Sequence, residues 1–272
     1  MKKILCPVDG SSAADNAVIY SAKLAKKFGA RLELFNVQVL ADLTPADAVL
    51  GKDYNIQAAA ARLEQKALEV KQVFKVDCEA KVATGLFSLN SAIREEALDF
   101  DLVVMGTQGE DDLNKRLFGS HTYKFIRSSS VPILLIPNGC GYSEISRIAY
   151  AFDYWNEHET PMTHVVQLAK SLSAELCILQ VIEQRFTRHA EMQLERTQQK
   201  IQGLYADEVK ITFDALYSYT PSEGLQVFMN AGRADVMALC SRHGKFFHSV
   251  FDHSLTRSIS KNASYPVYIF HR

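Results

Sequence analysis

The chain contains two copies of one sequence pattern, and this internal repeat restricts the possible fold more than any other feature. Residues in the first part of the pattern recur 144 positions later, and residues in its last part recur 134 positions later. The matching pairs include Ile4 and Ile148, Asp9 and Asp153, Asp101 and Asp235, and Ser120 and Ser254. Ten residues are therefore missing from the second copy, in the region after its second strand. The repeat predicts a tandem duplication of one domain.

The two copies meet at a stretch that favours a turn. Pro137-Asn138-Gly139-Cys140-Gly141 is rich in residues that break regular structure. We therefore expect one domain over residues 1–138 and a second over residues 144–272.

Within each copy, short apolar runs alternate with amphipathic helical segments. The first copy predicts strands at Lys3–Val8, Arg31–Val37, Cys78–Ala83, Leu102–Met105 and Pro132–Ile136. Helices are expected at Ser12–Phe28, with Gly29 as its carboxyl-terminal cap, at Asn55–Phe74, at Ser88–Ala97 and from near Ser120. The second copy predicts strands near Arg147–Phe152, Leu176–Val181, Val209–Leu216, Val236–Leu239 and Val267–Phe270. Strands that alternate with helices predict an α/β fold, with a parallel sheet covered by helices on both faces.

Composition excludes several functional classes. The formal net charge is −1, which gives no reason to expect nucleic acid as a partner. No apolar run approaches the roughly 18 residues of a membrane helix, and no hydrophobic export signal opens the chain. The five cysteines are odd in number and scattered, which predicts reduced thiols and a cytoplasmic location.

A glycine-containing loop follows the fourth strand of the first copy. Gly106, Gly109, Gly119 and Ser120 form the pattern G-x2-G-x9-G-S between a strand and a helix. Glycine permits close approach of the backbone to a ligand, and peptide N–H groups before a helix favour phosphate. The alternative is a set of tight turns without a ligand. Three carboxylates at 110–112 would repel a polyphosphate unless they point outward or hold Mg²⁺.

Asp9 follows the first strand and adds to this prediction. Ligands of parallel α/β sheets bind outside the carboxyl ends of the strands, where the strand order reverses. Asp9 and the loop at Gly106 both follow such ends, so one site can use both. The alternative role for Asp9 is local, as an acceptor for N–H groups at the start of the helix around Ser11 and Ser12.

These motifs resemble the universal stress protein family, whose ATP-binding members carry G-x2-G-x9-G-[S/T] after the fourth strand. The opening segment Lys3–Ser11 also resembles the first strand of that family. The resemblance implies two tandem open sheets of five parallel strands in the order 3-2-1-4-5, a Rossmann-like, adenine nucleotide alpha hydrolase-like fold. It implies ATP or a related adenine nucleotide as the ligand of the first domain, with or without Mg²⁺. The implied ligand-binding residues are Pro7, Asp9, Val37, Gly106, Gly109, Gly119, Ser120 and His121.

The resemblance also assigns roles to some of these residues. Gly109, Gly119 and Ser120 would hold the phosphates, Asp9 would lie by the adenosine part, and Val37 beside the base. Family members commonly pair two domains through their last strands. The two halves are therefore expected to form an intrachain pseudo-dimer, with a homodimer as a further level of assembly.

The second copy has lost the glycine pattern. Its equivalent positions are Cys240, His243, His253 and Ser254, and Tyr219 stands at the offset expected for Gly85. Imidazole side chains would fill the space that phosphate needs, so nucleotide binding of the first kind is not expected there. Cys240, His243, His248 and His253 are metal-ligand residue types, but their spacing is not that of a compact zinc finger. We predict no metal site, and a different ligand or none in this half.

Three functions are compatible with these observations to different degrees. The first is a cytoplasmic stress-response protein that binds ATP as a regulatory ligand. No general base or nucleophile accompanies the loop, so we expect no enzyme, although slow ATP hydrolysis remains compatible with the sequence. The second is a protein that binds no nucleotide and acts through an unknown protein partner or an unknown small ligand in its carboxyl-terminal domain. The third, an enzyme of a related α/β family, is disfavoured because S-G-G-x-D-S, H-I-G-H and Walker motifs are absent from the sequence.

Overall fold

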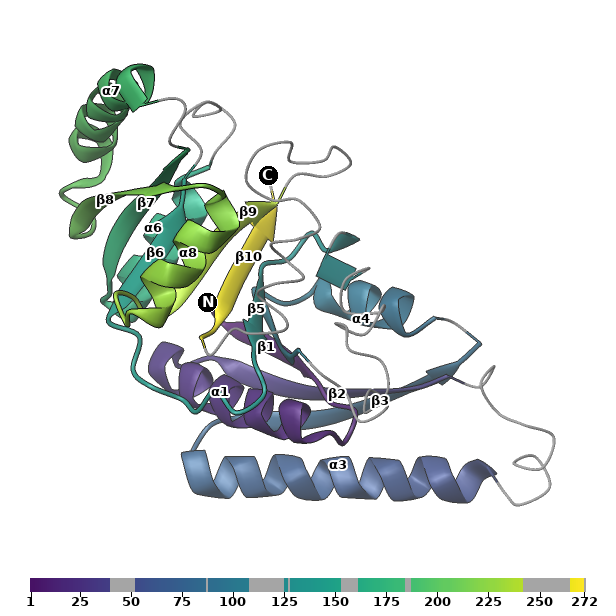
Figure 1. Ribbon diagram of the computed structural model, residues 1–272. Coiled ribbons are helices and arrows are strands. Elements are labelled where there is room, and N and C mark those ends of the chain that lie inside the picture. The colour runs from purple at the N-terminus through teal and green to yellow at the C-terminus, as the bar shows by residue number, and fades with distance from the viewer. Residues whose placement is uncertain are drawn as a thin grey trace. The chain divides into compact units, whose positions relative to one another are not determined.

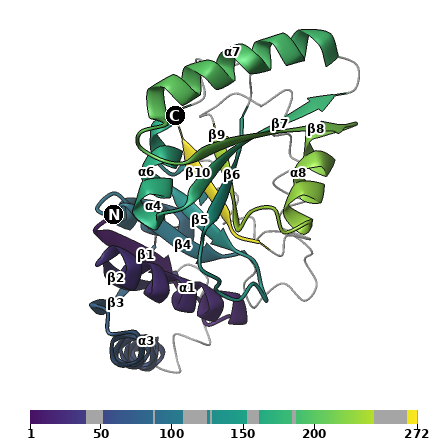
Figure 2. The same ribbon diagram turned by 90° about the vertical axis from the view of Figure 1, so that its left-hand side faces the viewer.

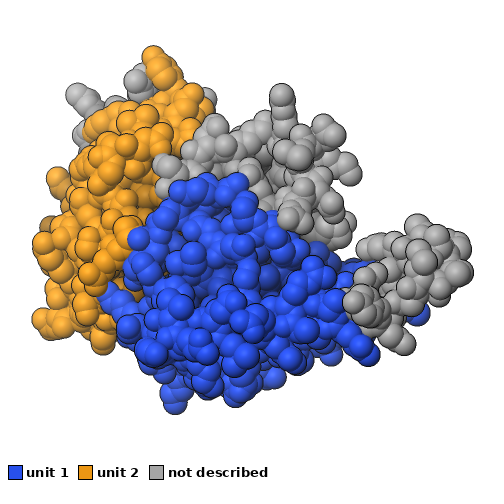
Figure 3. All heavy atoms as spheres, turned by 90° about the horizontal axis from the view of Figure 1, so that it is seen from below, with its two compact units in different colours: residues 1–142 blue, residues 143–272 orange. Residues whose placement is uncertain are grey.

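The computed structural model divides the chain into two compact units, Met1–Tyr142 and Ser143–Arg272 (Figure 3). It describes residues 1–39, 52–86, 88–107, 125–126, 128–152, 161–183, 187–241 and 265–271. Several residues singled out in the sequence lie outside these ranges, namely Gly109, Gly119, Ser120, His121, Asp153, His243, His248, His253 and Ser254.

Unit 1 is a parallel sheet with helices on both faces. Its elements are β1 (Lys3–Pro7), α1 (Ser12–Phe28), β2 (Arg31–Val39), α3 (Lys52–Phe74), β3 (Cys78–Gly85), α4 (Leu89–Ala97), β4 (Leu102–Gly106) and β5 (Ile133–Ile136). The strands run parallel in the order β3-β2-β1-β4-β5, which confirms the predicted order 3-2-1-4-5. Helices α1 and α3 cover one face and α4 covers the other (Figure 1).

Unit 2 repeats this architecture. Its elements are β6 (Arg147–Ala151), α6 (Thr163–Leu172), β7 (Glu175–Glu183), α7 (Thr187–Tyr205), β8 (Ile211–Ser218), α8 (Pro221–Asn230), β9 (Val236–Ser241) and β10 (Val267–His271). The parallel order is β8-β7-β6-β9-β10, with α6 and α7 on one face and α8 on the other (Figure 2). The predicted α/β class is thus confirmed in both units.

Helix α1 begins and ends where its sequence predicts. The Ser11 side chain caps its amino terminus by accepting a hydrogen bond from the Ala14 N–H at 3.1 Å. Gly29 ends the helix in the left-handed conformation, with φ of 62°, and its N–H bonds carbonyls of the last turn. Ser173 ends α6 in the same way, with φ of 55°, although serine carries a side chain that disfavours this conformation.

The central strands form the core of each unit. Leu102, Val103 and Val104 of β4 are at most 1% exposed, so the prediction of a strand buried on both faces is confirmed. All residues of β5 and β10 are buried as well. This continuous burial provides the apolar stabilisation that holds the strand ends in place.

Aspartates at equivalent positions of the two units bind the backbone at the start of the first strand. Asp101 Oδ2 accepts hydrogen bonds from the backbone N–H groups of Lys2 and Lys3, at 2.5 and 3.0 Å. Asp235 Oδ2 accepts from the Ser146 N–H and the Arg147 N–H, both at 2.8 Å. Burial opposes ionisation of Asp101, but the two backbone hydrogen bonds outweigh it and lower its pKa. The repeat therefore preserves the anchoring contact at the amino ends of the strands.

The structure corrects some of the predicted boundaries. Strand β8 begins and ends two residues later than predicted, and α3 begins at Lys52 instead of Asn55. The strand register places Gly85 beside Val39 and Ser218 beside Glu183, so Ser218, not Tyr219, is the counterpart of Gly85. The longer α8, of 10 residues against 9 in α4, offsets a shorter turn before it, and the difference of one residue arises in the turn between the helix and Asp101 or Asp235. None of the helices in the described part of the chain is sufficiently long and apolar to span a membrane.

Candidate functional site

A cavity of about 180 Å³ opens in unit 1 where β1, β2 and β4 end. Four of the residues predicted for the ligand site line it, namely Pro7, Asp9, Val37 and Gly106. The other wall residues are Val8, Ser11, Ala14, Phe35, Asn36, Leu89, Ile93 and Met105. The structure thus brings together the predicted residues that it describes, while Gly109, Gly119, Ser120 and His121 lie outside the described residues.

Hydrogen bonds between β1 and β2 fix the base of the cavity. The Val8 N–H donates to the Phe35 carbonyl at 2.8 Å, and Asn36 Nδ2 donates to the Val8 carbonyl at 2.7 Å. Asn36 Oδ1 in turn accepts from Gln38 Nε2 at 2.6 Å. Both polar ends of Asn36 therefore bind the protein itself, and the wall that remains is mainly apolar.

Asp9 lies at the exposed rim of the cavity. Its Oδ1 accepts a hydrogen bond from the Ser11 N–H at 3.0 Å, which is the local role that its position suggested. A carboxylate has two oxygens and several acceptor sites, so this bond leaves capacity for a ligand hydroxyl. The local role and a role in binding are therefore compatible in this geometry.

Gly106 is required by packing against α1. A Cβ at this position would lie 2.6 Å from both the carbonyl carbon and the carbonyl oxygen of Ala13. The φ of Gly106 is not among the positive values found in the described residues, so packing and not backbone conformation requires glycine here. The glycine thus allows the first turn of α1 to lie directly against the end of β4, where both elements line the cavity.

Helix α4 provides the opposite wall through Leu89 and Ile93. One turn beyond Ile93, Glu96 is bound by Lys81 Nζ from β3, at 2.7 and 2.6 Å from its two oxygens. Glu33 of β2 lies beside Glu96, and its Oε1 is buried. Burial first, and then the charge of Glu96, raise the pKa of Glu33.

Unit 2 carries larger side chains at some of the equivalent strand-end positions. Cys240 stands where unit 1 has Gly106, and it is buried. Tyr150 and Phe152 replace Cys6 and Val8, and their rings lie 5.9 Å apart. Further aromatic contacts join Tyr150 to Phe270 and Phe270 to His164. Unit 2 therefore uses this part of its sheet for aromatic packing.

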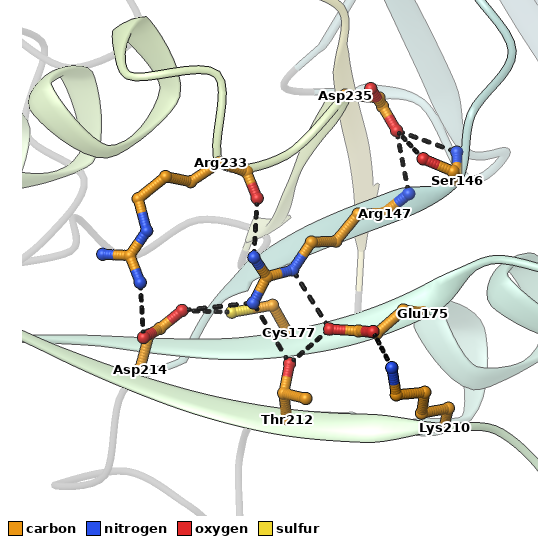
Figure 4. Close-up of polar contacts among 9 residues, drawn as sticks. All are labelled: Ser146, Arg147, Glu175, Cys177, Lys210, Thr212, Asp214, Arg233 and Asp235. Carbon is orange, nitrogen blue, oxygen red and sulfur yellow. Dashed lines mark hydrogen bonds and ion pairs between the residues drawn. The ribbon is translucent and has the colours of Figure 1, made fainter.

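Unit 2 also contains a polar cluster, at the amino ends of β6, β7 and β8 (Figure 4). The Arg147 guanidinium lies at its centre, 3.2 Å from Glu175 Oε1 and 3.3 Å from Asp214 Oδ2. Its Nη1 donates to the Arg233 carbonyl at 3.0 Å, and Nη2 donates to the Thr212 hydroxyl at 3.3 Å.

The surrounding groups complete this network. Arg233 Nη2 donates to Asp214 Oδ1 at 2.8 Å, and Lys210 Nζ lies 2.6 Å from Glu175 Oε2. The bond from Lys210 lowers the pKa of Glu175, while burial, aided by Asp214, raises the pKa of Cys177 to about 12. Each charged group of the cluster lies within ion-pair distance of an opposite charge, and the cluster is remote from the carboxyl ends of the strands, so we interpret it as structural.

Sequence reasoning did not identify several cavity residues. Asn36, Leu89, Ile93, Met105 and Ala14 carry no motif, because ordinary apolar and amide side chains line a pocket through tertiary packing alone. Among the described residues, no group of His, Cys, Asp or Glu side chains has the arrangement of a metal site. The histidines considered for metal binding lie outside the described ranges.

Comparison with known proteins agrees with the fold and with the family resemblance. The family model described as "Universal stress protein family" matches residues 1–137. A universal stress protein of Thermus aquaticus is 30% identical over 149 residues, which is 50% of this chain and 98% of that protein. One of Methanocaldococcus jannaschii is 29% identical over 142 residues, covering 50% of this chain and 81% of that protein. The crystal structure of a universal stress protein from Archaeoglobus fulgidus matches 99% of this chain and 98% of that chain, with a TM-score of 0.77 at 18% identity. With its family model matched, its parallel sheets in the order 3-2-1-4-5 and its glycine loop after β4, the chain belongs to the universal stress protein family.

Proposed function

We propose that unit 1 binds ATP, or a related adenine nucleotide, as a regulatory ligand. One observation carries this proposal. The cavity lies at the carboxyl ends of β1, β2 and β4, and Gly106 on its wall is the first glycine of the G-x2-G-x9-G-S pattern. The glycine pattern proposed to bind phosphate and the cavity therefore share one residue.

The position of the cavity supports nucleotide binding. Strand β1 pairs with β2 on one side and with β4 on the other, so the chain connections diverge from β1 in opposite directions. Ligands of open α/β sheets bind at this kind of switch point.

The size and polarity of the cavity suggest that the base, the ribose and the phosphates of a nucleotide would lie in different places. At about 180 Å³ the cavity is smaller than the about 300–1,000 Å³ of sites that enclose a drug-sized ligand, so it suits only part of a nucleotide. The mainly apolar wall near Val37 suits the base, and Asp9 at the rim suits a ribose hydroxyl. The phosphates would then extend toward Gly109, Gly119 and Ser120.

A regulatory role is proposed because the cavity wall offers little for catalysis. Among the described residues that line it, Asp9 is the one titratable side chain, and one of its oxygens already binds the Ser11 N–H. Efficient hydrolysis needs a positioned base or nucleophile. We also propose a cytoplasmic location, which is supported by five cysteines that are all buried thiols.

Calorimetric titration of ATP and ADP, with and without Mg²⁺, tests the proposal on the full chain. We expect one site per chain, lost in Gly119→Val and weakened in Asp9→Asn. The matched control is His253→Val, which introduces valine at the equivalent position of the second copy and should leave binding unchanged.

Two results would count against the proposal. Two sites per chain would show that unit 2 also binds nucleotide. No heat of binding in the wild-type chain would favour the other candidate, a family member that acts through protein contacts.

A further inference from the structure

Residues 137–142, here called the joining segment, are the stretch of unit 1 that leads to unit 2. The segment follows β5 and begins with a tight turn, in which the Cys140 N–H donates to the Pro137 carbonyl at 3.1 Å. Gly139 occupies the third position of this turn with φ of 76°, a conformation that suits glycine.

One face of α1 holds the joining segment. Asn16 Nδ2 donates to both carbonyl oxygens of the turn, to Cys140 at 2.7 Å and to Pro137 at 3.2 Å. The ring of Tyr142 packs edge-on against Tyr20, at 4.8 Å between centroids, and Lys23 Nζ lies 4.6 Å from the centre of the Tyr142 ring. Asn16, Tyr20 and Lys23 lie four and three residues apart, so they share one side of the helix.

The same helix forms part of the cavity. Its cap Ser11 and its first-turn residue Ala14 line the wall. Two positions beyond Ala14 along the same uninterrupted helix, Asn16 binds the joining segment.

Strand β5 supplies a second connection between the cavity and the segment. Ile136, the residue before the segment, pairs with the cavity residue Gly106, and its carbonyl accepts the Thr107 N–H at 3.1 Å. The joining segment is thus attached on both sides to elements that line the cavity.

The residues that hold the segment are particular to the first copy. At the positions 144 residues later, the sequence has Thr160, His164 and Gln167 in place of Asn16, Tyr20 and Lys23. The general packing of the fold therefore does not demand these three side chains.

We propose that the joining segment responds to occupancy of the cavity: a nucleotide bound there holds residues 137–142 more firmly against α1. The physical basis is linkage. A ligand that binds only when the first turn of α1 and the end of β4 are in place reduces every local opening that disturbs them. The segment is held by the same helix and follows β5, which pairs with the end of β4, so its opening becomes rarer when the ligand is bound. This inference rests on the proposed binding of nucleotide in unit 1.

The alkylation rate of the Cys140 thiol reports how often the joining segment opens. The thiol is buried and burial raises its pKa, so alkylation requires the segment to open. We would measure the rate of alkylation of Cys140 by N-ethylmaleimide in the full chain, by mass spectrometry of peptides, with and without ATP. Cys177 of unit 2 serves as the internal reference in the same samples.

Without ligand, Asn16→Leu should speed the alkylation of Cys140 by roughly tenfold, the factor expected from lost hydrogen bonds. The control Gln167→Leu should have no effect on this rate. Saturating ATP should slow alkylation of Cys140 several-fold in the wild-type chain, while the rate at Cys177 stays constant.

Each outcome decides a separate point. If calorimetry shows that ATP binds and the Cys140 rate does not change, the coupling proposed here is wrong. If ATP does not bind, the proposed function and the coupling both fail. Equal rates for the wild-type chain and Asn16→Leu without ligand would show that Asn16 does not hold the segment.

Discussion

Gly106 and Ala13 approach so closely that a single added carbon could not fit between them, since it would lie 2.6 Å from the Ala13 carbonyl group. The contact is between backbone atoms and the first turn of a helix, neither of which can rotate away as a flexible side chain could. The end of β4 and the start of α1 therefore pack rigidly against each other at the wall of the cavity.

Gly106→Ala should accordingly destabilise the protein by about 1–3 kcal/mol, the usual cost of overpacking. It should also weaken ligand binding, because the displaced turn carries Ser11 and Ala14 of the cavity wall. Urea unfolding followed by circular dichroism measures the first effect, and calorimetry the second. Cys240→Ala is the control, since it keeps a Cβ at the equivalent position. A Gly106→Ala variant as stable as the wild-type chain would contradict this account.

Ser173→Gly should stabilise unit 2. Ser173 ends α6 with φ of 55° and ψ of 36°, close to the values of 62° and 33° at Gly29. A side chain in this conformation costs about 1–2 kcal/mol. Part of the gain from its removal is lost because glycine makes the unfolded chain more flexible. We expect a net gain of about 0.5–1 kcal/mol, measured by urea unfolding with Trp155, the one tryptophan, as the fluorescent probe. The reverse variant, Gly29→Ser, should lose a similar amount, and a gain there would refute the argument.

Glu33→Gln should make the protein more stable at neutral pH. The pKa of Glu33 is raised above 4.5 in the folded state by burial and by the nearby Glu96, with Lys81 and Arg31 as the opposing positive charges. A raised carboxyl pKa contributes stability that is fully present below the unfolded value and is lost as pH rises through the folded value. The uncharged glutamine removes this loss, so the variant should exceed the wild-type chain at pH 7–8 but not near pH 4.

Urea midpoints taken across this pH range give the comparison. Glu79→Gln on the neighbouring strand is the control, because the Glu79 side chain is 50% exposed and pairs with Arg31 at the surface. The same pH dependence in both variants would show that burial of Glu33 is not the cause.

Arg147→Met should be the most damaging change in the polar cluster of unit 2. It would leave Glu175 and Asp214, which are 20% and 21% exposed, without their shared cation. The cost should be about 2–3 kcal/mol, below the 3–5 kcal/mol of a fully buried pair because the Arg147 side chain is 29% exposed. Lys210→Met should cost less than about 1 kcal/mol, since the Lys210 side chain is 75% exposed. Unfolding by urea compares the two, and equal losses would argue against a central role for Arg147.

The sequence predicted the features that depend on local chemistry. The bounds of α1 followed from the cap at Ser11 and the glycine at 29, and burial of β4 followed from its unbroken apolar run. The offsets of the repeat predicted that both sheets would share one strand order. The first two properties depend on residues that are near one another in the chain, and the third depends on the repeat itself.

The features that escaped prediction arise from contacts between distant segments. Nothing in the sequence indicates that Ala13 lies against Gly106, or that Asn16 binds carbonyl groups at 137 and 140. Ser173 adopts a conformation that its residue type disfavours, because the packing of α6 and β7 outweighs the local preference. The cavity residues Leu89 and Ile93 look like any apolar face of a helix until the sheet beneath them is known.

The aspartates at 101 and 235 bind the first strand of each unit in the same way, and both act at the amino ends of the strands. Each copy therefore carries its own means of aligning its sheet, at the strand ends remote from the cavity of unit 1. After duplication, the opposite edge could change its loops without disturbing that alignment. The two copies thus keep one sheet architecture while the sequences at their opposite strand ends have diverged, from Gly106 and Gly109 in the first to Cys240 and His243 in the second.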